Sequence, residues 1–113
     1  MSFANSFHPT ETILFYMVKS LIGEKHVLRH YRPDFLKGLE LDVFVPHLNI
    51  GIEYQGTQHF KPIEHWGGKE TFKRTCERDR RKKKLCNQNQ VKLIYFSFTE
   101  QITEALVKER LGL

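Results

Sequence analysis

The most regular pattern in the chain is an alternation of apolar and polar residues between residues 39 and 55. This stretch reads LELDVFVPHLNIGIEYQ, and its two alternating runs are separated by the four residues Pro-His-Leu-Asn. A period of two is typical of β-strands, and two such runs around a short turn predict a β-hairpin. With the turn at residues 46–49, Val45 faces Ile50, and Asp42 lies directly opposite Glu53.

Other segments follow the helical period or form short apolar runs. Residues 10–22 carry an apolar stripe that follows Thr10, a good N-cap, and ends at Gly23, a frequent helix stop. The remaining predicted elements are a strand at 26–31, a loop at 56–68, a long helix at 69–89, a buried strand at 91–98 and a final helix opened by Thr99 and Glu100. The order α-β-β-β-α-β-α predicts an α/β fold with a mixed sheet flanked by helices.

The length of 113 residues fits one domain that covers residues 1–113. A hydrophobic content of 40% with 12% aromatic residues is typical of a folded soluble domain. No apolar run approaches the length needed to cross a bilayer, and the first residues lack the positive start and apolar stretch of a secretory signal. We therefore expect a cytoplasmic protein with no membrane partner.

Basic residues are concentrated in the predicted long helix. The chain has a net charge of +5 and a pI near 9.3, and nine of its eighteen Lys and Arg residues lie between Lys69 and Lys84. Such a cluster favours a polyanionic partner, most commonly nucleic acid; a merely solvated helix face is the alternative. The candidate nucleic-acid-binding residues are Lys73, Arg74, Arg78, Arg80, Arg81, Lys82, Lys83 and Lys84.

The predicted hairpin brings two carboxylates together. Side chains that face each other across two strands have Cβ atoms about 4.5–5.5 Å apart, so Asp42 and Glu53 would repel one another. A hard divalent cation with oxygen ligands, Mg²⁺ above all, removes that repulsion. The alternative is an exposed sheet face with two ordinary acids, and a register shifted by one residue would separate the pair onto opposite faces.

Two further acids lie on helix faces that the pattern turns inward. Asp79 shares a helical stripe with Phe72, Cys76 and Cys86, while Lys and Arg residues crowd the other faces of the helix. Glu11 stands at the start of the apolar stripe of the first helix. An acid on a core face is costly unless it is paired or bound to a metal. Both are therefore expected near the hairpin acids. Alternatively, Glu11 could stabilise the first turn of its own helix as a cap or in a local salt bridge.

Polar residues that follow Glu53 complete the candidate site. Gln55 lies on the same strand face and could position a water molecule or a phosphate oxygen. His59 could act as a general base, a phosphate contact or a ligand, and a plain hydrogen-bonding role is the alternative. No zinc site is predicted from the other histidines, although His65 could line the cleft.

These residues resemble the PD-(D/E)XK nuclease superfamily, in which an Asp on one hairpin strand and a Glu-x-Lys on the next carry a metal site. The corresponding residues are Asp42 and Glu53-Tyr54-Gln55, so that Gln55 stands where the family has lysine. The chain is most similar to the very-short-patch-repair endonucleases and the Glu-Asp-x-His-Asp homing endonucleases. That pattern is met by Glu11, Asp42, His59 and Asp79, and the resemblance implies a restriction-endonuclease-like core.

The resemblance implies a metal-dependent endonuclease that hydrolyses phosphodiester bonds of DNA. Asp42, Glu53 and the Tyr54 carbonyl would bind Mg²⁺, with Mn²⁺ able to substitute. The catalytic residues would be Asp42, Glu53, Gln55, His59, Asp79 and Glu11. RNA stays open as a substrate, because Tyr54, Phe60 and Trp66 could stack on unpaired bases.

Three other classes of function compete with this reading. They are a non-catalytic nucleic-acid-binding module on a nuclease-like fold, a protein-interaction domain with an acidic partner, and a hydrolase of another phosphoester. A domain of this size is also expected to act together with a second copy or with another domain. It could form a homodimer that cuts both strands, or belong to a larger protein with a separate DNA-recognition domain.

Overall fold

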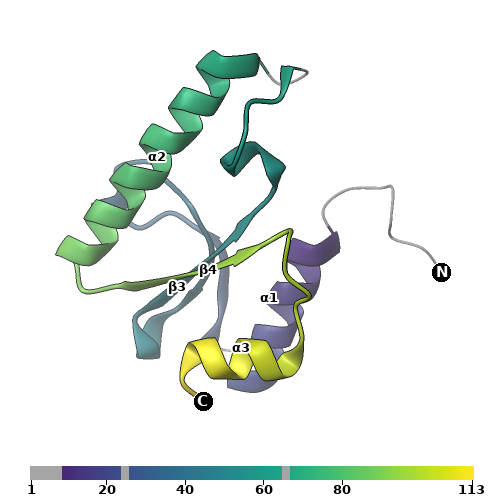
Figure 1. The fold of residues 1–113 in the computed structure, drawn as a ribbon. Helices are drawn as coiled ribbons and strands as arrows, with labels where there is room; N and C mark the ends of the chain where they lie inside the picture. Colours follow the sequence, from purple (N-terminus) through teal and green to yellow (C-terminus); the bar gives the residue numbers. More distant parts are fainter. Residues whose placement is uncertain (1–8, 24–25, 65–66) are drawn as a thin grey trace.

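The computed structural model describes residues 9–23, 26–64 and 67–113, which form helices on both sides of a four-stranded sheet (Figure 1). The order of helices and strands is α-β-β-β-α-β-α, as the sequence predicts. Their bounds are α1 Pro9–Ile22, β1 Leu28–Tyr31, β2 Leu41–Val45, β3 Ile50–Gln55, α2 Gly68–Gln88, β4 Lys92–Ser97 and α3 Glu104–Leu111. His65 and Trp66, two residues of the predicted loop, lie outside the described residues.

The sheet is mixed and has the strand order β1-β2-β3-β4. The first three strands pair antiparallel, whereas β4 runs parallel to β3 after the chain has crossed over through α2. Val45 pairs with Ile50, which confirms the predicted hairpin register. The turn is a short 3-10 segment, Pro46–Leu48, closed by Asn49 in the left-handed conformation with φ of 52°. Asn accepts this conformation more readily than most residues.

Helices cover both faces of the sheet, so the core has two parts. The first part joins α1 and α3 to one face, and its fully buried members are Leu14, Val18, Val43, Val45, Ile52, Phe96 and Val107. The second part lies between α2 and the other face, where Cys86 packs with Phe44 and Val91. Figure 1 shows α2 on one side of the sheet and the α1–α3 pair on the other. Within the described residues, no helix combines the length and apolar character needed to cross a membrane.

The start of the final helix differs from the prediction. α3 begins at Glu104, with the Thr103 hydroxyl as its cap, which accepts a hydrogen bond from Leu106 N at 3.1 Å. Glu100 instead accepts a hydrogen bond from Ser97 N at 2.9 Å and forms an ion pair with Arg110. Since Thr99 and Thr103 offer the same capping chemistry, the contact with Arg110 on α3 decides between the two starts.

Two strands also differ from the prediction in extent or position. β1 begins at Leu28, two residues after the expected start at His26. β4 was expected to be a buried strand, but it lies at the edge of the sheet with Lys92 exposed and only Ile94 and Phe96 buried. An apolar run therefore indicated the buried face of β4 correctly but not its place in the sheet.

Candidate functional site

A cavity of about 370 Å³ opens at the end of the sheet where β2 begins and β3 ends. Because β2 and β3 run antiparallel, the first residues of one strand and the last residues of the other meet at this end. The start of α1, Arg32 just after β1 and the middle of α2 border the same cavity. Its lining includes Glu11, Asp42, Glu53, His59, Asp79 and Lys82.

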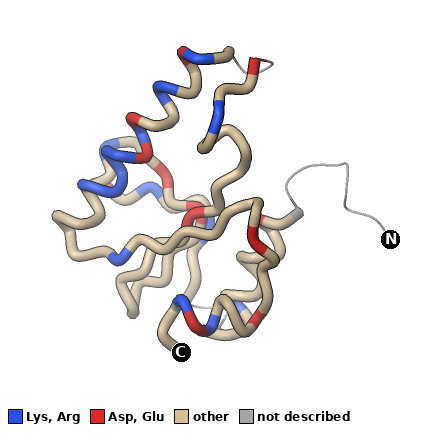
Figure 2. The backbone as a smooth tube through the Cα atoms, viewed as in Figure 1, with Lys and Arg blue, Asp and Glu red and all other residues tan. Residues whose placement is uncertain are grey.

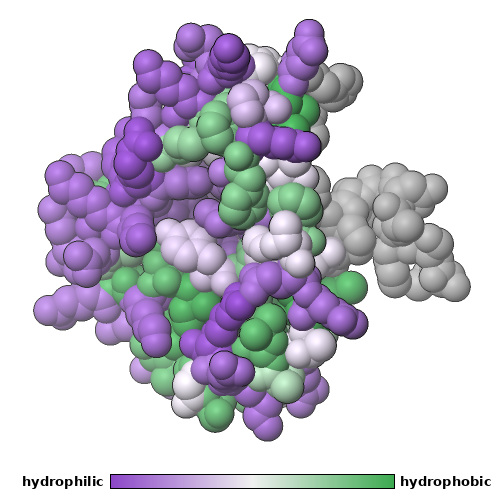
Figure 3. All heavy atoms as spheres, viewed as in Figure 1, coloured by the Kyte–Doolittle hydropathy of each residue, from purple (hydrophilic) through white to green (hydrophobic). Residues whose placement is uncertain are grey.

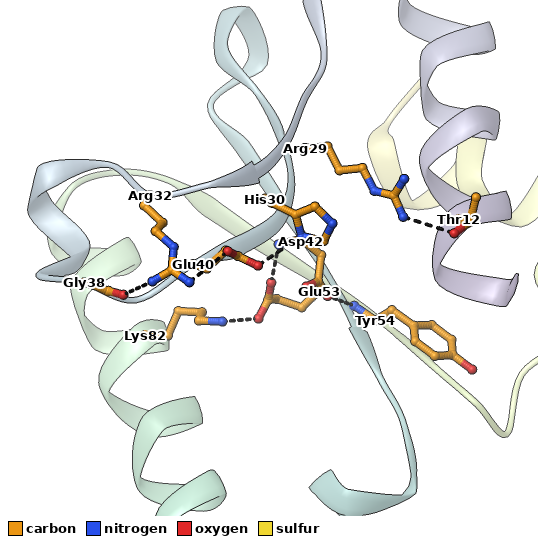
Figure 4. Close-up of polar contacts among 10 residues, drawn as sticks. All are labelled: Thr12, Arg29, His30, Arg32, Gly38, Glu40, Asp42, Glu53, Tyr54 and Lys82. Atoms are coloured by element: carbon orange, nitrogen blue, oxygen red, sulfur yellow. Dashed lines mark hydrogen bonds and ion pairs between the residues drawn. The ribbon is translucent and has the colours of Figure 1, made fainter. Parts of the chain in front are cut away.

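Asp42 and Glu53 contact each other's strand through side chain and backbone. Asp42 N donates a hydrogen bond to Glu53 Oε2, and Tyr54 N donates one to Asp42 Oδ2, both at 2.8 Å. The described backbone pairing of β2 and β3 ends one step earlier, at Val43 and Ile52. The two carboxylates thus continue the hairpin by side-chain contacts, and each is fixed in position by a backbone donor (Figure 4).

Lys82 supplies a cation to this pair. Its Nζ atom donates to Glu53 Oε1, and the two side chains are only 14% and 8% exposed. The sequence prediction placed Lys82 on the outward basic faces of the helix, and the structure corrects this. Lys82 lies three residues after Asp79 and four before Cys86, so it shares their inward stripe. Helical phase was therefore the available signal, but the run of lysines around it hid the exception.

Burial and mutual repulsion raise the pKa of both acids. The pKa of Asp42 is raised from 3.8 to about 7, first because the carboxyl is removed from water and then because Glu53 and Glu11 are close. The pKa of Glu53 is also raised by burial, against the opposing effect of Lys82. A site that holds two carboxylates at neutral pH favours an added positive charge.

His59 and Asp79 form a second pair at the cavity. His59 lies in the short 3-10 turn Thr57–His59 after β3, and its Nδ1 is 2.8 Å from Asp79 Oδ2 on α2. A carboxylate only accepts hydrogen bonds, so Nδ1 carries the proton and Nε2 of the neutral ring is free to accept one. The structure brings together these two predicted residues, which are twenty positions apart in the chain.

The other predicted residues divide into cavity-lining and more distant positions. Glu11 and Tyr54 line the cavity with Asp42, and the charge of Glu11 contributes to the raised pKa of Asp42. Gln55 is half-buried and is not among the described residues that line the cavity. The position that holds lysine in the resembling family thus lies outside the cavity wall here, whereas Lys82 reaches Glu53 from α2.

One histidine at the site was not among the site residues predicted from the sequence. His30, near the end of β1, lies within a group of possible cation ligands with Glu11 and Asp42, whose ligand atoms are all within 4.8 Å of one another. His26 stands four residues before His30, but that spacing does not involve Glu11 or Asp42, and the pairing of His30 with Asp42 depends on the β1–β2 register. No local sequence signal could have identified it.

The basic residues of α2 form the outer wall beside the cavity. Figure 2 shows Lys and Arg along the helix, and Figure 3 shows a hydrophilic surface over it. Among the eight predicted residues, Lys82 is turned inward; the exposed ones are Lys73, Arg74, Arg78, Arg80, Arg81, Lys83 and Lys84. Arg78 also lines the cavity, so the exposed basic surface is continuous with the site.

The donor set at the cavity fits a hard or borderline divalent cation. Carboxylate oxygens of Asp42, Glu53 and Glu11 are the ligand type that Mg²⁺ and Mn²⁺ bind. Both oxygens of Glu53 already have partners, one in Lys82 and the other in Asp42 N. A cation that uses Glu53 would therefore compete with the Lys82 ammonium group for this carboxylate.

Comparison with known proteins finds relatives without a stated activity. No protein-family profile matches the chain, and no solved structure matches it. The "Uncharacterized protein 307L" of Invertebrate iridescent virus 6 is 37% identical over 95 residues, which cover 74% of this chain and 48% of that protein. The "Uncharacterized protein 094L" of Frog virus 3 (isolate Goorha) is 35% identical over 79 residues, which cover 68% of this chain and 51% of that protein. The chain thus spans about half the length of the curated relatives it matches.

Proposed function

We propose that the chain is a divalent-metal-dependent endonuclease domain that hydrolyses phosphodiester bonds of DNA. The observation that carries this proposal is the buried Asp42–Glu53 pair in one cavity with a carboxylate-bound His59, next to exposed basic residues of α2. Paired acids, a base with a free ring nitrogen and a polycationic wall together suit a charged phosphodiester. The restriction-endonuclease-like fold and the PD-(D/E)XK resemblance belong to the same proposal.

In this proposal Asp42, Glu53 and the Tyr54 carbonyl hold the cation, and Mg²⁺ or Mn²⁺ fits them. A bound divalent cation would polarise the scissile phosphate and lower the pKa of a nearby water molecule. His59 accepts the proton of the attacking water at Nε2, and Asp79 keeps the ring in the required tautomer through Nδ1. Once the Lys82 ammonium group is released from Glu53, it stabilises the negative charge that develops at the phosphate.

The basic wall binds the DNA backbone. Exposed Lys and Arg residues run along α2, and one of them, Arg78, lines the cavity. Contacts from such residues to phosphates position a duplex without reading its sequence. Sequence recognition and cleavage of the second strand would then need a further domain or a second copy of the chain.

Cleavage of supercoiled plasmid tests the proposal. Purified protein is incubated with DNA in EDTA, Mg²⁺ or Mn²⁺, beside the variants Asp42→Asn and Glu53→Gln and the control Glu109→Gln on exposed α3. We expect metal-dependent nicking or linearisation that falls about 1,000-fold in the two site variants, because metal activation contributes several kcal/mol to such a reaction. The control should cut like the unmodified protein.

Two results would contradict the proposal. One is that plasmid, single-stranded DNA and RNA all stay uncleaved with every metal ion tested. The other is undiminished cleavage by a folded Asp42→Asn variant. The first result combined with salt-sensitive DNA binding in EDTA would support a non-catalytic nucleic-acid-binding module. That second candidate is favoured by one observation, the ion pair in which Lys82 neutralises Glu53.

A further inference from the structure

Three elements that are distant in sequence bring a mixed nitrogen and oxygen ligand set together. Glu11 comes from the first turn of α1, His30 from β1 and Asp42 from β2, and their ligand atoms all lie within 4.8 Å of one another. Ligands around a first-row divalent ion lie about 2.0–2.2 Å from it, so two ligands on opposite sides are about 4.4 Å apart. The group is thus already close to the size that an ion requires.

We propose that Glu11, His30 Nε2 and Asp42 form a binding site for a divalent transition-metal ion, for which Mn²⁺ is the test ion. The site shares Asp42 with the proposed nuclease centre but leaves Glu53 in its ion pair with Lys82. It rests on the ligand geometry and does not require that the protein cut DNA.

The backbone of β1 places His30 at this site. Arg29 pairs with Val43 and Tyr31 with Leu41, so His30 stands opposite Asp42 in the register. His30 has φ of 52°, in the left-handed region that residues other than Gly seldom adopt within a strand. Figure 4 shows the imidazole ring next to Asp42.

A second carboxylate fixes the ring in the form that a metal ligand needs. His30 Nδ1 is 3.0 Å from Glu40 Oε2, and Glu40 is in turn held by Arg32 Nη2 at 3.1 Å. Arg32 also donates to the Gly38 carbonyl at 2.8 Å, which anchors the far end of this chain of contacts. Because Glu40 accepts the Nδ1 proton, Nε2 is the nitrogen left with a lone pair. Histidines that bind metals characteristically donate their other N–H to a carboxylate in this way.

The cations of the neighbourhood have other partners. Lys82 bonds Glu53, Arg32 bonds Glu40, and Arg29 donates to Thr12 at 3.0 Å. Glu11 and Asp42 lie close to each other and to His30, and none of these three cations forms an ion pair or a hydrogen bond with either carboxylate among the described residues. A divalent ion supplies the charge that the two carboxylates lack.

The imidazole determines which ions fit best. Mg²⁺ and Ca²⁺ prefer oxygen ligands throughout, whereas Mn²⁺ and the later transition metals also accept imidazole nitrogen. The site should therefore bind Mn²⁺ in the presence of excess Mg²⁺, while an all-carboxylate site would exchange the two readily.

Electron paramagnetic resonance of Mn²⁺ tests the site without any nucleic acid. Loss of the free-ion signal gives the affinity, and electron spin-echo modulation reports ¹⁴N bound directly to the ion. We expect ¹⁴N modulation from the unmodified protein, and its loss with at least a tenfold weaker affinity in His30→Asn, since even outer-shell changes cost metal sites 10–100-fold. Asn suits this position because it tolerates the left-handed backbone.

Matched variants locate the nitrogen. His47→Asn, at an exposed turn residue, should leave affinity and modulation unchanged. Glu40→Gln should weaken Mn²⁺ binding about tenfold but retain the ¹⁴N signal, because it changes the hydrogen-bond partner of His30 and not the ligand itself. Circular dichroism of each variant shows whether it is folded.

Three outcomes would overturn the site: Mn²⁺ bound without ¹⁴N, ¹⁴N modulation that persists in folded His30→Asn, or modulation that disappears in His59→Asn instead. The first would make His30 a protonated counter-ion of the two carboxylates. The fate of the nuclease proposal is separate. If the protein binds Mn²⁺ through His30 but cleaves no nucleic acid, the metal site stands and the nuclease proposal fails. If it cleaves DNA with Mg²⁺ but bound Mn²⁺ gives no ¹⁴N modulation, the nuclease proposal stands and the metal site fails.

Discussion

The charge of the cavity depends on Lys82 more than on the other basic residues of α2, because its ammonium group reaches Glu53. Both partners are nearly excluded from solvent, so their attraction is only weakly screened by water. Breaking a buried ion pair by removing one partner leaves a buried charge without compensation, which is costlier than the pair itself is stabilising. The metal-free protein is therefore expected to be sensitive to this residue.

The variant Lys82→Met should lower the free energy of unfolding of the metal-free protein by about 3 kcal/mol. The same variant should bind Mn²⁺ more tightly than the unmodified protein if the ion uses Glu53, because no ammonium group has to be displaced. Urea denaturation in EDTA and in Mn²⁺ measures both effects. Lys84→Met, at an exposed position, is the control and should change stability by less than about 0.5 kcal/mol. An equal loss of stability with and without Mn²⁺ would contradict the competition.

Asp42 makes the stability of the metal-free protein depend on pH. Its folded-state pKa of about 7 is above the ordinary value of 3.8, so the folded protein holds this proton more tightly than the unfolded chain. The stabilising contribution is complete below about pH 4 and is lost as the pH rises to about 7. Asp42→Asn, which keeps an acceptor for Tyr54 N, should therefore be more stable than the unmodified protein at pH 8 by ~2 kcal/mol.

Denaturation in EDTA at pH 4 and pH 8 checks this pH dependence. The difference between Asp42→Asn and the unmodified protein should become small at pH 4, where Asp42 is protonated in the folded state and partly protonated in the unfolded chain. A difference of the same size at both pH values would show that packing and not titration is responsible. Added Mn²⁺ should reverse the order at pH 8, because an ion that binds the folded state stabilises only the protein that retains its ligand.

Among the elements, the β2–β3 hairpin positions the two carboxylates, and its turn depends on Asn49. The left-handed φ of 52° at this position is accessible to Asn and Gly but strained for most other residues. Asn49→Ala should therefore lower the free energy of unfolding by about 1 kcal/mol, while Asn49→Gly should be close to neutral. Thermal denaturation of both variants gives the comparison, and equal losses would show that the Asn side chain and not the backbone is important.

The elements that local patterns specify were predictable from the sequence. The period of two fixed both strands of the hairpin, and with the turn it gave the register that sets Asp42 opposite Glu53. The apolar stripe of α1 and the long α2 were likewise within reach of the helical period. The start of α3 was not, because Glu100 is bound by Arg110 ten residues away.

Site residues follow the same division between local and distant contacts. Asp42, Glu53, His59, Asp79 and Glu11 could be found because each stands at a marked place in a strand, loop or helix stripe. The inward turn of Lys82 was masked by its basic neighbours. The position of His30 depends on how β1 pairs with β2, and strands with little alternation of their own give no register to read.

At the scale of the whole molecule, six exposed basic residues of α2 form two rows. Arg74, Arg78 and Arg81 line one shallow groove, and Arg78 also borders the cavity. Arg80, Lys83 and Lys84 line a second groove on the side of β4. A duplex whose phosphate enters the cavity would follow the first row.

The triple substitution of Arg74, Arg78 and Arg81 by Gln should therefore weaken DNA binding more than the same change at Arg80, Lys83 and Lys84. Both variants lose three charges, so a difference between them reports position and not net charge. Binding is measured in EDTA across salt concentrations. The slope of log affinity against log salt should fall by roughly 0.9 for each lost phosphate contact. Equal effects of the two variants would mean that the duplex contacts the helix without the proposed orientation.

The left-handed backbone at His30 also limits how this position can change over evolution. Asn and Asp adopt that conformation at little cost, and single base changes convert a His codon into codons for either. Both replacements exchange a nitrogen donor for an oxygen donor and leave the strand intact. If the proposed site binds an ion, one mutational step would thus shift its preference from a transition metal toward magnesium while the backbone stays unchanged.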